Sequence, residues 1–515
     1  MEQIEKEDPM KDYIKIQTEK GKDCYLESDK YVLHYSNKLK NGDRIYRCKF
    51  YKDQNIKCKA FLKLSENNEF VDRDNNHSCV VDEKKVQNLK ITNDIRANIS
   101  QSEIIYNVKP RDIFDASIRK AIKRKSDIDP KEKEIKENDN HISIKMEPIP
   151  NFVNLKSVIY RTINKNIPKD VENISDLPEE SEYYQTISGK KFLNYKNNHI
   201  LIFMSPNQAN LLYENNHHVF IDGTFYAAPK CSYQIITIRI HNNKEDIFHT
   251  IAYGIMTDKT MNSYIELFDN IKNFTYNNRE NKRDTDLRLP LTIHCDFEQA
   301  LIGAIKQIYP NTEIKLCLWH LYRNLELNRN KIYGSKENQT EESLKILKRI
   351  QTLCYIDPNY VNECFVLISE DAEIDEKDNK FVNEYFKKTY LEKYNIKDWN
   401  YYKIFDHRTN NACESYHHVL NSKFSKKPTF WKFLNEIRNE ENNLLIEVNS
   451  MKNGNFFRKK KRGIPTFEHV TKKYYQFYDD EINKINSSNI ASKRDKIIKI
   501  WYKALLEFPL YDYNM

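Results

Sequence analysis

The stretch that decides the fold is HHVFIDGTF, residues His217–Phe225. Its apolar run Val219–Ile221 leads directly into Asp222 and is closed by Gly223, which is typical of a buried strand rather than a surface strand. A carboxylate at the end of such a strand costs free energy to desolvate unless another group compensates it. Asp222 is therefore a candidate site residue, with a strand-end cap or turn residue as the alternative.

Two further acidic residues occur in comparable settings. A second apolar strand, 291–295, ends in Asp296, and Glu414 lies in HRTNNACESYHHVLN, which reads as the start of a helix. We hypothesise that Asp222, Asp296 and Glu414 meet around two divalent ions, with Asp222 as the bridge. Carboxylates suit Mg²⁺ or Mn²⁺, and two ions about 4 Å apart stabilise both the attacking and the leaving oxygen in phosphodiester cleavage.

The elements between these acids predict an α/β fold. Ser205 and Pro206 give an N-cap and a first helical residue, and Gly254 suggests a bend or close packing in its strand. The expected order after the first helix is three strands, helix, strand, helix, strand, helix, which is the order of an RNase H-like mixed sheet. In that fold the first and fourth strands are adjacent, so Asp222 and Asp296 would lie side by side. The expected helices cover 206–214, 261–274, 298–309 and a segment from 318, and the expected strands end at 223, 240, 256, 295 and 317.

A small β module near the N-terminus carries four candidate metal ligands, Cys48, Cys58, His77 and Cys79. Its short strands, two of which an Asn41-Gly42 hairpin turn joins, contain too few aliphatic residues for a core that is stable without a metal ion or disulfides. Thiolates and imidazole suit tetrahedral Zn²⁺, whose binding would supply folding free energy. The alternative is four unrelated residues, and the fourth ligand is the least defined.

The composition limits the classes of protein. The chain has 515 residues, a formal net charge of +8 and ten cysteines. That charge permits a polyanionic partner without requiring one. No run of about 18 apolar residues predicts a membrane helix, and the N-terminus lacks the apolar core of a signal peptide. We therefore expect free thiols or metal ligands rather than disulfides.

Residues 200–325 resemble the transposase domain of Mutator-like elements (MULE). The resemblance rests on DGTF at Asp222, Tyr233-Gln234, DFEQA at Asp296 and CLWH at Cys317, followed by Thr409-Asn-Asn411 and Glu414. It implies that Asp222, Asp296 and Glu414 form a DDE triad, with His320 near the active centre. A packed histidine at the start of a helix is the alternative for His320.

The N-terminal module resembles a FLYWCH-type zinc finger, related to the WRKY type. The matching pieces are Tyr46-Arg-Cys48, Cys58-Lys-Ala60 and His77-Ser-Cys79. Tyr46 stands where that family usually has Trp, and Cys79 stands where it has His. The resemblance implies a small β-sheet finger that binds DNA or a protein partner.

Several residues are candidates for DNA contact. Arg408 and Asn411 lie one turn before Glu414, on a helix whose periodicity puts Glu414, either His417 or His418, and Asn421 on one face. The run Arg458, Lys459, Lys460, Lys461 and Arg462 is a candidate for backbone contact or nuclear import, with a solvated loop as the alternative.

These inferences divide the chain into successive parts. The expected parts are a disordered N-terminus over 1–22, the FLYWCH-like finger over 23–82, a basic flexible linker over 83–150, a helical pre-domain over 151–199, the transposase core over 200–325 and 406–430, an all-helical insertion over 326–405, and a helical C-terminal region with the basic run over 431–515.

The resulting hypothesis is a nuclear DNA transposase that cuts and joins transposon ends as a homo-oligomer on DNA, with Mg²⁺ or Mn²⁺ in the core, Zn²⁺ in the finger and no membrane partner. The alternative is a domesticated nuclear DNA-binding regulator without catalysis, and a third is a protein-interaction module on the same scaffold. The intact set of acids favours the first.

Overall fold

The computed structural model describes residues 8–18, 20–100, 110–128, 151–279, 288–334, 340–372 and 375–454, with scattered residues between 472 and 500. The chain forms two compact units, Met1–Lys169 and Asp170–Met515. Each is described by itself.

The first unit begins with a six-stranded antiparallel sheet in which each strand pairs with the next along the chain. The turn at Asn41-Gly42 joins its third and fourth strands, and Gly42 has a φ of 93°, which glycine adopts without steric cost. Within the segment expected to be disordered, Tyr13–Gln17 forms a strand, because β1 pairs with β2. The strands are β1 (Tyr13–Gln17), β2 (Asp23–Glu27), β3 (Tyr31–Lys38), β4 (Arg44–Cys48), β5 (Phe61–Leu64) and β6 (Phe70–Asp74).

Three helices follow the sheet: α1 (Glu83–Ser100), α2 (Pro110–Ile128) and α3 (Phe152–Asn166). Their apolar side chains form one core, which contains Ile91, Ile95, Ile99, Phe114, Leu155, Ile159 and Ile163. Asn93 fixes α1 to the sheet, since it exchanges hydrogen bonds with the backbone of Gln17. The segment expected as a flexible linker is thus helical over 83–100 and 110–128.

The second unit is built on a seven-stranded mixed sheet with the order β13-β12-β9-β10-β11-β8-β7. β9 is parallel to β12 and antiparallel to β10, and β12 is parallel to β13. The strands carrying Asp222 and Asp296 are therefore adjacent, as predicted. The strands are β7 (Leu193–Lys196), β8 (Ile200–Phe203), β9 (His218–Thr224), β10 (Gln234–Asn242), β11 (Ile247–Met256), β12 (Thr292–Cys295) and β13 (Glu313–Leu316).

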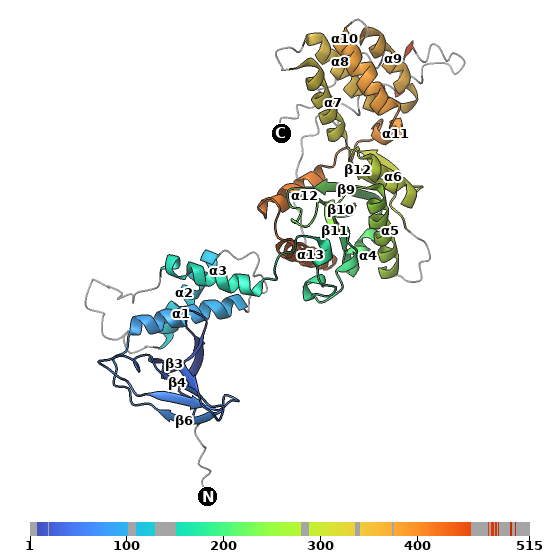
Figure 1. Cartoon of the computed structure of the whole chain (residues 1–515). Helices are drawn as coiled ribbons and strands as arrows, with labels where there is room; N and C mark the ends of the chain where they lie inside the picture. Colours follow the sequence, from blue (N-terminus) through green and yellow to red (C-terminus); the bar gives the residue numbers. More distant parts are fainter. Residues whose placement is uncertain are drawn as a thin grey trace, which may run out of the picture. The chain divides into compact units, whose positions relative to one another are not determined.

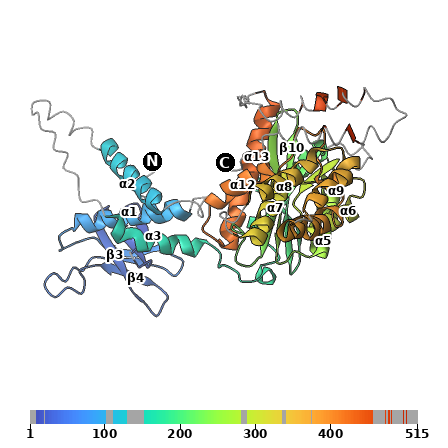
Figure 2. The same ribbon diagram turned by 90° about the horizontal axis from the view of Figure 1, so that it is seen from above.

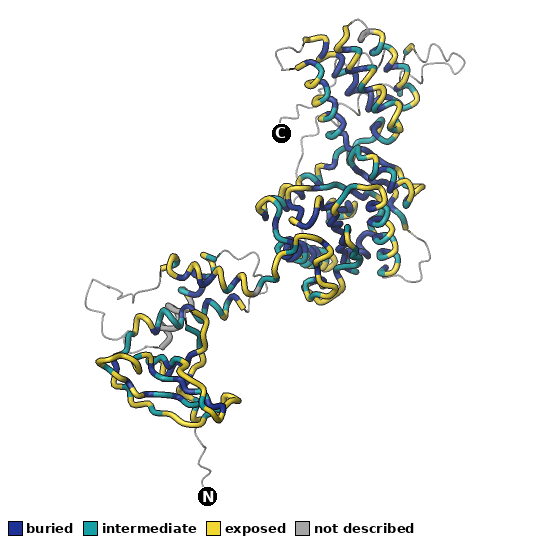
Figure 3. Tube along the Cα trace, in the orientation of Figure 1, coloured by how far each residue is buried: buried dark blue, intermediate teal, exposed yellow. Residues whose placement is uncertain are grey.

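Helices cover both faces of this sheet. The helices α4 (Pro206–Glu214), α5 (Met261–Asn278) and α6 (Gln299–Ile308) lie on one face, and α12 (Asn411–Ser422) and α13 (Phe430–Lys452) lie on the other (Figures 1 and 2). Gly254 allows close packing, because a Cβ at this position would lie 2.9 Å from Cδ1 of Leu267 on α5. The buried side chains follow the strands and the inner faces of the helices (Figure 3).

An all-helical segment separates β13 from α12, in agreement with the expected insertion. It consists of α7 (Leu318–Tyr333), α8 (Glu341–Thr352), α9 (Val361–Ala372), α10 (Glu376–Asn379), the π-helical segment η7 (Lys380–Leu391) and α11 (Ile396–Trp399). The expected helical pre-domain differs, because its only α-helix is α3 in the first unit and residues 170–199 hold two 3₁₀ turns and β7. Among the described residues, no helix is both long and apolar enough to cross a membrane.

Candidate functional site

The first two acids lie at the carboxyl ends of adjacent parallel strands. Register pairs in β9 and β12 run up to Phe220 with His294, and Asp222 and Asp296 each stand two residues further on. Each carboxylate accepts a hydrogen bond from the backbone N–H of the next residue, at 2.9 Å for Asp222 and 2.6 Å for Asp296. These bonds fix both side chains at one edge of the sheet.

The start of α12 brings Glu414 to the same edge. The buried Asn410 precedes α12, and its Nδ2 donates to the carbonyl of Ile221 at 3.2 Å. Its backbone N–H donates to Sγ of Cys317 at 3.2 Å, and Leu318 N–H donates to the Arg408 carbonyl at 2.9 Å. A segment far along the chain is thereby tied to β9 and to the start of α7, and Glu414 stands in the first turn of α12.

His320 lies between two of the acids. Its Nδ1 is 3.6 Å from Oδ1 of Asp296, and Cys317, His320 and Glu414 offer ligand atoms within 4.8 Å of one another. No third metal ligand lies near Cys317 and His320 in the sequence, whereas the fold brings Glu414 close to both. The Sγ of Cys317 already accepts a backbone N–H, and burial raises the pKa of this thiol to about 12, which favours a structural role for the cysteine.

His417 contacts Asp222. The sequence allowed either His417 or His418 to share the helix face with Glu414. Its Nδ1 lies 3.3 Å from Oδ2 of Asp222, and its Nε2 lies 2.8 Å from the hydroxyl of Thr237 on β10. His417 is buried and His418 is exposed. His417 therefore holds the Asp222 carboxylate from α12.

The electrostatics of the site show that the three acids share one environment. Burial raises the pKa of Asp296 and of Glu414, and the negative charge of Asp222 raises both further. His320 opposes these shifts in both groups. The buried Oε1 of Glu414 has no hydrogen-bond partner. An orphaned carboxylate oxygen beside two further acids fits a divalent cation.

The residues expected to contact DNA lie in different settings. Arg408 is half-buried, its Nε donates to the Ile404 carbonyl at 2.8 Å, and its guanidinium lies over the rings of Phe405 and Tyr355. Asn411 is exposed at the start of α12. DNA contact by either residue stays a prediction. The basic run at 458–462 lies outside the described residues.

The four predicted ligands of the first unit form a compact cluster. Sγ of Cys48 lies 3.6 Å from Sγ of Cys79, and Nδ1 of His77 lies 3.4 Å from Sγ of Cys58 and 3.6 Å from Sγ of Cys79. Sulfurs at the corners of a tetrahedron with metal–sulfur bonds of about 2.3 Å would stand about 3.8 Å apart. The cluster could therefore hold a zinc ion, with Cys79 as the fourth ligand.

Two neighbours of this cluster were missed by sequence reasoning. Oε2 of Glu27 lies 3.0 Å from Nε2 of His77, and both side chains are buried. The ring of Tyr31 stacks on His77 at 3.7 Å between centroids. A carboxylate on the outer nitrogen fixes the orientation of a metal-ligating histidine. Burial opposes ionisation of the Cys58 thiol, but the backbone N–H groups of Ala60 and Ser78 outweigh it and lower the pKa of this thiol to about 6.

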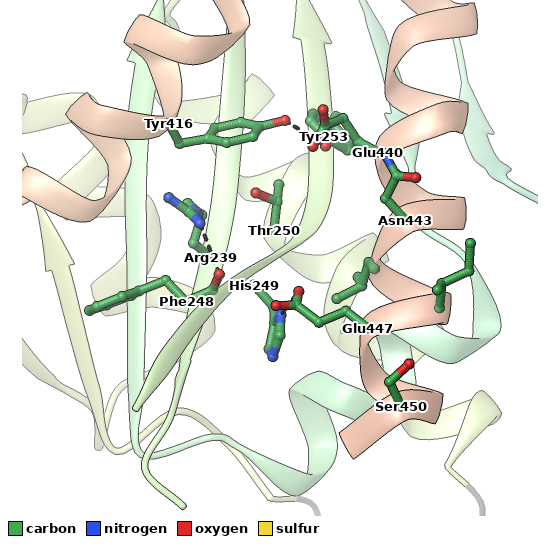
Figure 4. Close-up of a pocket in the computed structure, with 12 residues that line it drawn as sticks. Arg239, Phe248, His249, Thr250, Tyr253, Tyr416, Glu440, Asn443, Glu447 and Ser450 are labelled. Atoms are coloured by element: carbon green, nitrogen blue, oxygen red, sulfur yellow. Dashed lines mark hydrogen bonds and ion pairs between the residues drawn. The ribbon is translucent and has the colours of Figure 1, made fainter. Parts of the chain in front are cut away.

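A cavity of about 480 Å³ lies between α13 and the strands β10 and β11 (Figure 4). Tyr416 of α12 and Tyr253 meet there through their hydroxyl groups at 2.7 Å. Arg239 stacks on Tyr416 and donates to the carbonyls of Ala412 and Phe248. None of the three acids lines this cavity. Its polar wall supports the side of α12 opposite Glu414.

The geometry thus defines an α/β domain with two strand-end aspartates and one helix glutamate at one edge of its mixed sheet. Among the described residues of this domain, the group whose ligand atoms all lie within 4.8 Å of one another is Cys317, His320 and Glu414. Residues 218–324 match the family model of the MULE transposase domain. The match runs from β9 into α7, includes Asp222 and Asp296, and ends before Glu414. It indicates a transposase-related function. No curated protein matches the chain.

Proposed function

We propose that this chain is a DNA transposase of the Mutator-like type, which cleaves and joins DNA strands with Asp222, Asp296 and Glu414 as its DDE triad. The observation that carries the proposal is that Asp222 and Asp296 follow adjacent parallel strands while the helix start bearing Glu414 is tied to the same edge, within a domain that matches the MULE model over residues 218–324. Acids placed at one site repel one another, which lowers the stability of the fold. Their placement at one sheet edge therefore favours a functional reason over a structural one.

The proposal includes an RNase H-like fold for the second unit. Its support is the order of elements and the sheet order β13-β12-β9-β10-β11, in which the first strand of the core is flanked by the second and the fourth. Helices on both faces agree with that fold. The helical segment from α7 to α11 corresponds to the insertion between the second and the third acid.

Two Mg²⁺ or Mn²⁺ ions would be held by the oxygens of Asp222, Asp296 and Glu414. A bound pair would supply Lewis-acid stabilisation to the attacking and the leaving oxygen of a phosphodiester. The protein contributes the fixed positions of the oxygens: backbone N–H groups orient Asp222 and Asp296, and His417 holds the second oxygen of Asp222. His320 supplies a partner to Asp296 at the same edge.

For the first unit we propose a FLYWCH-type zinc finger that assists DNA binding. Its support is the convergence of Cys48, Cys58, His77 and Cys79, with Glu27 behind His77. The full proposal places the protein in the nucleus, acting as a homo-oligomer on transposon ends.

A plasmid cleavage assay with the full-length chain tests the proposal directly. We expect nicked or linear DNA with Mg²⁺ or Mn²⁺, and intact DNA with EDTA, because the chemistry needs a filled hard-oxygen site. We also expect intact DNA with Ca²⁺, because this larger ion takes the same oxygens in a looser geometry than the octahedral one of Mg²⁺. DNA binding without cleavage under any of these conditions would favour the domesticated regulator instead.

His417 offers a test of how the site is held together. Replacing it with leucine removes the partner of Asp222 Oδ2 and of Thr237 Oγ1. Because neighbours that orient a ligating carboxylate typically matter about 10- to 100-fold in metal affinity, we expect the Mn²⁺ concentration for half-maximal cleavage to rise by about that factor. The rate at saturating Mn²⁺ should fall less.

The neighbouring His418 is the matched control, since it has the same chemistry on the same helix but is exposed. We expect His418→Leu to leave the metal dependence unchanged, and His417→Gln, which retains a donor, to recover part of the affinity. Equal metal dependence in the two leucine variants would remove the positioning role of His417.

A further inference from the structure

Three aromatic side chains stand exposed in the β9–β10 connection and at the start of β10. Phe225, Tyr226 and Tyr233 are 44%, 42% and 50% exposed. The rings of Phe225 and Tyr233 meet edge to face, with centroids 5.3 Å apart. Burying a large aromatic ring stabilises a protein, so an exposed ring lacks that stabilisation. A cluster of exposed rings therefore marks an interaction surface.

The backbone beneath these rings is held rigidly. Lys427, in the connection between α12 and α13, donates from its backbone N–H to the Tyr226 carbonyl at 3.0 Å. Its ammonium group donates to the carbonyls of Ser232 and Tyr233 at 3.0 and 3.3 Å. The aromatic surface is therefore formed before any ligand arrives, which lowers the entropic cost of binding.

Lysines lie beside the rings and on the connections that carry them. The Lys259 ammonium lies 4.8 Å from the centroid of the Phe225 ring and 2.7 Å from Oε2 of Glu298. Lys230 and Lys426 are exposed on the same connections, and Lys230 N–H donates to the Pro428 carbonyl at 3.2 Å. The nearby acids Asp258 and Glu298 are engaged, by Ser263 and Thr260 and by Lys259 and Tyr264 respectively. Aromatic rings among exposed lysines are the combination that binds single-stranded nucleic acid.

The surface lies at the same edge of the sheet as the acidic site. Phe225 follows Asp222 by three residues at the carboxyl end of β9, and Lys259 bridges from Phe225 to Glu298, which follows Asp296 by two residues. A strand bound over the rings would thus reach the three acids within a few nucleotides.

We propose that Phe225, Tyr226 and Tyr233, which we call the aromatic platform, bind unpaired bases of a DNA strand beside the acidic site. The inference rests on the proposed function and specifies its substrate: DNA that is single-stranded or opened next to the cleaved bond. Rings stack only on base faces that are free, and in an intact duplex these faces are covered by neighbouring base pairs. The lysines contact the backbone of the same strand.

Binding of fluorescent oligothymidine and of a fully paired duplex of equal length tests the platform, with full-length protein in EDTA so that no cleavage occurs. The ring-removing pair Phe225→Leu with Tyr233→Leu should weaken oligothymidine binding about tenfold or more, as expected for the loss of at least one stacked base. Duplex affinity should stay unchanged. A 2-aminopurine base in the single strand should be quenched by the wild-type protein and not by this variant.

The ring-preserving pair Phe225→Tyr with Tyr233→Phe is the matched control and should bind both DNAs like the wild type. The lysine pair Lys230→Gln with Lys426→Gln should weaken both DNAs and reduce the salt dependence of binding, because phosphate contacts carry no preference for unpaired bases. All four positions are exposed, so equal melting temperatures will show that the fold is kept.

Equal affinity of the ring-removing and ring-preserving pairs for oligothymidine overturns the platform, and so does an equal loss for both DNAs. The cleavage assay is read separately. Cleavage that persists while the rings prove irrelevant overturns the platform alone, whereas ring-dependent binding without metal-dependent cleavage overturns the nuclease function and leaves the platform standing.

Discussion

Replacing Asp222 with asparagine is expected to reduce metal-dependent DNA cleavage about a thousandfold or more while leaving DNA binding in EDTA unchanged. The substitution keeps the shape of the side chain and an oxygen for the Gly223 N–H, but removes the charge that two divalent ions would share. Stabilisation of transition-state charge by bound metal contributes several kcal/mol, and about 1.4 kcal/mol corresponds to a tenfold change in rate. Plasmid cleavage and anisotropy on the same preparation measure the two quantities.

The stability of the metal-free variant separates a functional carboxylate from a structural one. In the wild type the charge of Asp222 raises the pKa of Asp296 and Glu414, adding to the effect of burial. When folding raises the pKa of a carboxyl group, the protein loses stability as the pH rises from the pKa of the unfolded state through the pKa of the folded state. The neutral amide in Asp222→Asn relieves this cost at neutral pH, so the melting temperature of the metal-free variant should equal or exceed that of the wild type.

Asp398→Asn serves as the control carboxylate, because Asp398 of α11 is a partly buried acid outside the triad that pairs with Lys306 of α6 at 3.2 Å. We expect this variant to cleave DNA normally. If Asp222→Asn lowered the melting temperature and kept cleavage, Asp222 would be a strand-end cap and the triad would be wrong.

The central sheet could be predicted because its strands are buried on both faces. Apolar runs marked β9 and β12, and the N-cap and proline at Ser205-Pro206 marked the start of α4, which spans the residues predicted. The adjacency of β9 and β12 followed from the order of elements and is confirmed by their register. The sequence alone therefore predicts that two of the acids lie together.

The partners of these acids could not be predicted, because they depend on how distant elements pack. Helical periodicity allowed either His417 or His418 to face the site, and only the packing of α12 against β9 selects His417. Glu27 lies 50 residues before His77, and a lone glutamate in a strand carries no signal that a histidine elsewhere needs an acceptor. The exposure of Phe225 and Tyr233 is equally invisible in a sequence, where aromatic residues suggest burial.

The three-helix core of the first unit was missed for a different physical reason. Ile91, Ile95 and Ile99 recur every four residues, but polar and charged residues surround this narrow stripe. Its partner α3 lies more than fifty residues further along. A stripe this narrow supports a helix only when other helices cover it, so the composition of 83–150 predicts a basic flexible linker instead.

Replacing Cys48 with alanine is expected to unfold the six-stranded sheet of the first unit and to release one tightly bound zinc ion per finger, while the second unit keeps its structure. Three ligands would remain in a module whose own core is small. Structural zinc contributes about 10–16 kcal/mol of apparent binding free energy in small fingers, which is as large as the roughly 5–15 kcal/mol stability of a whole domain. Hydrogen exchange in β3, β4 and β5 should rise to the level of an unfolded chain, and a zinc chelator should have the same effect on the wild type.

Cys24→Ala is the matched control for this prediction, because Cys24 is also buried in the same sheet but stands outside the ligand cluster. It loses only a small apolar side chain, so its sheet should stay protected and keep its zinc. Glu27→Gln lies between these cases: it retains an acceptor for His77 but weakens the charge-assisted bond, and zinc affinity should fall about 10- to 100-fold without unfolding at saturating zinc. If Cys48→Ala behaved like Cys24→Ala and chelators left exchange in β3 to β5 unchanged, the cluster would be four packed side chains and the sheet would be stable by its apolar core alone.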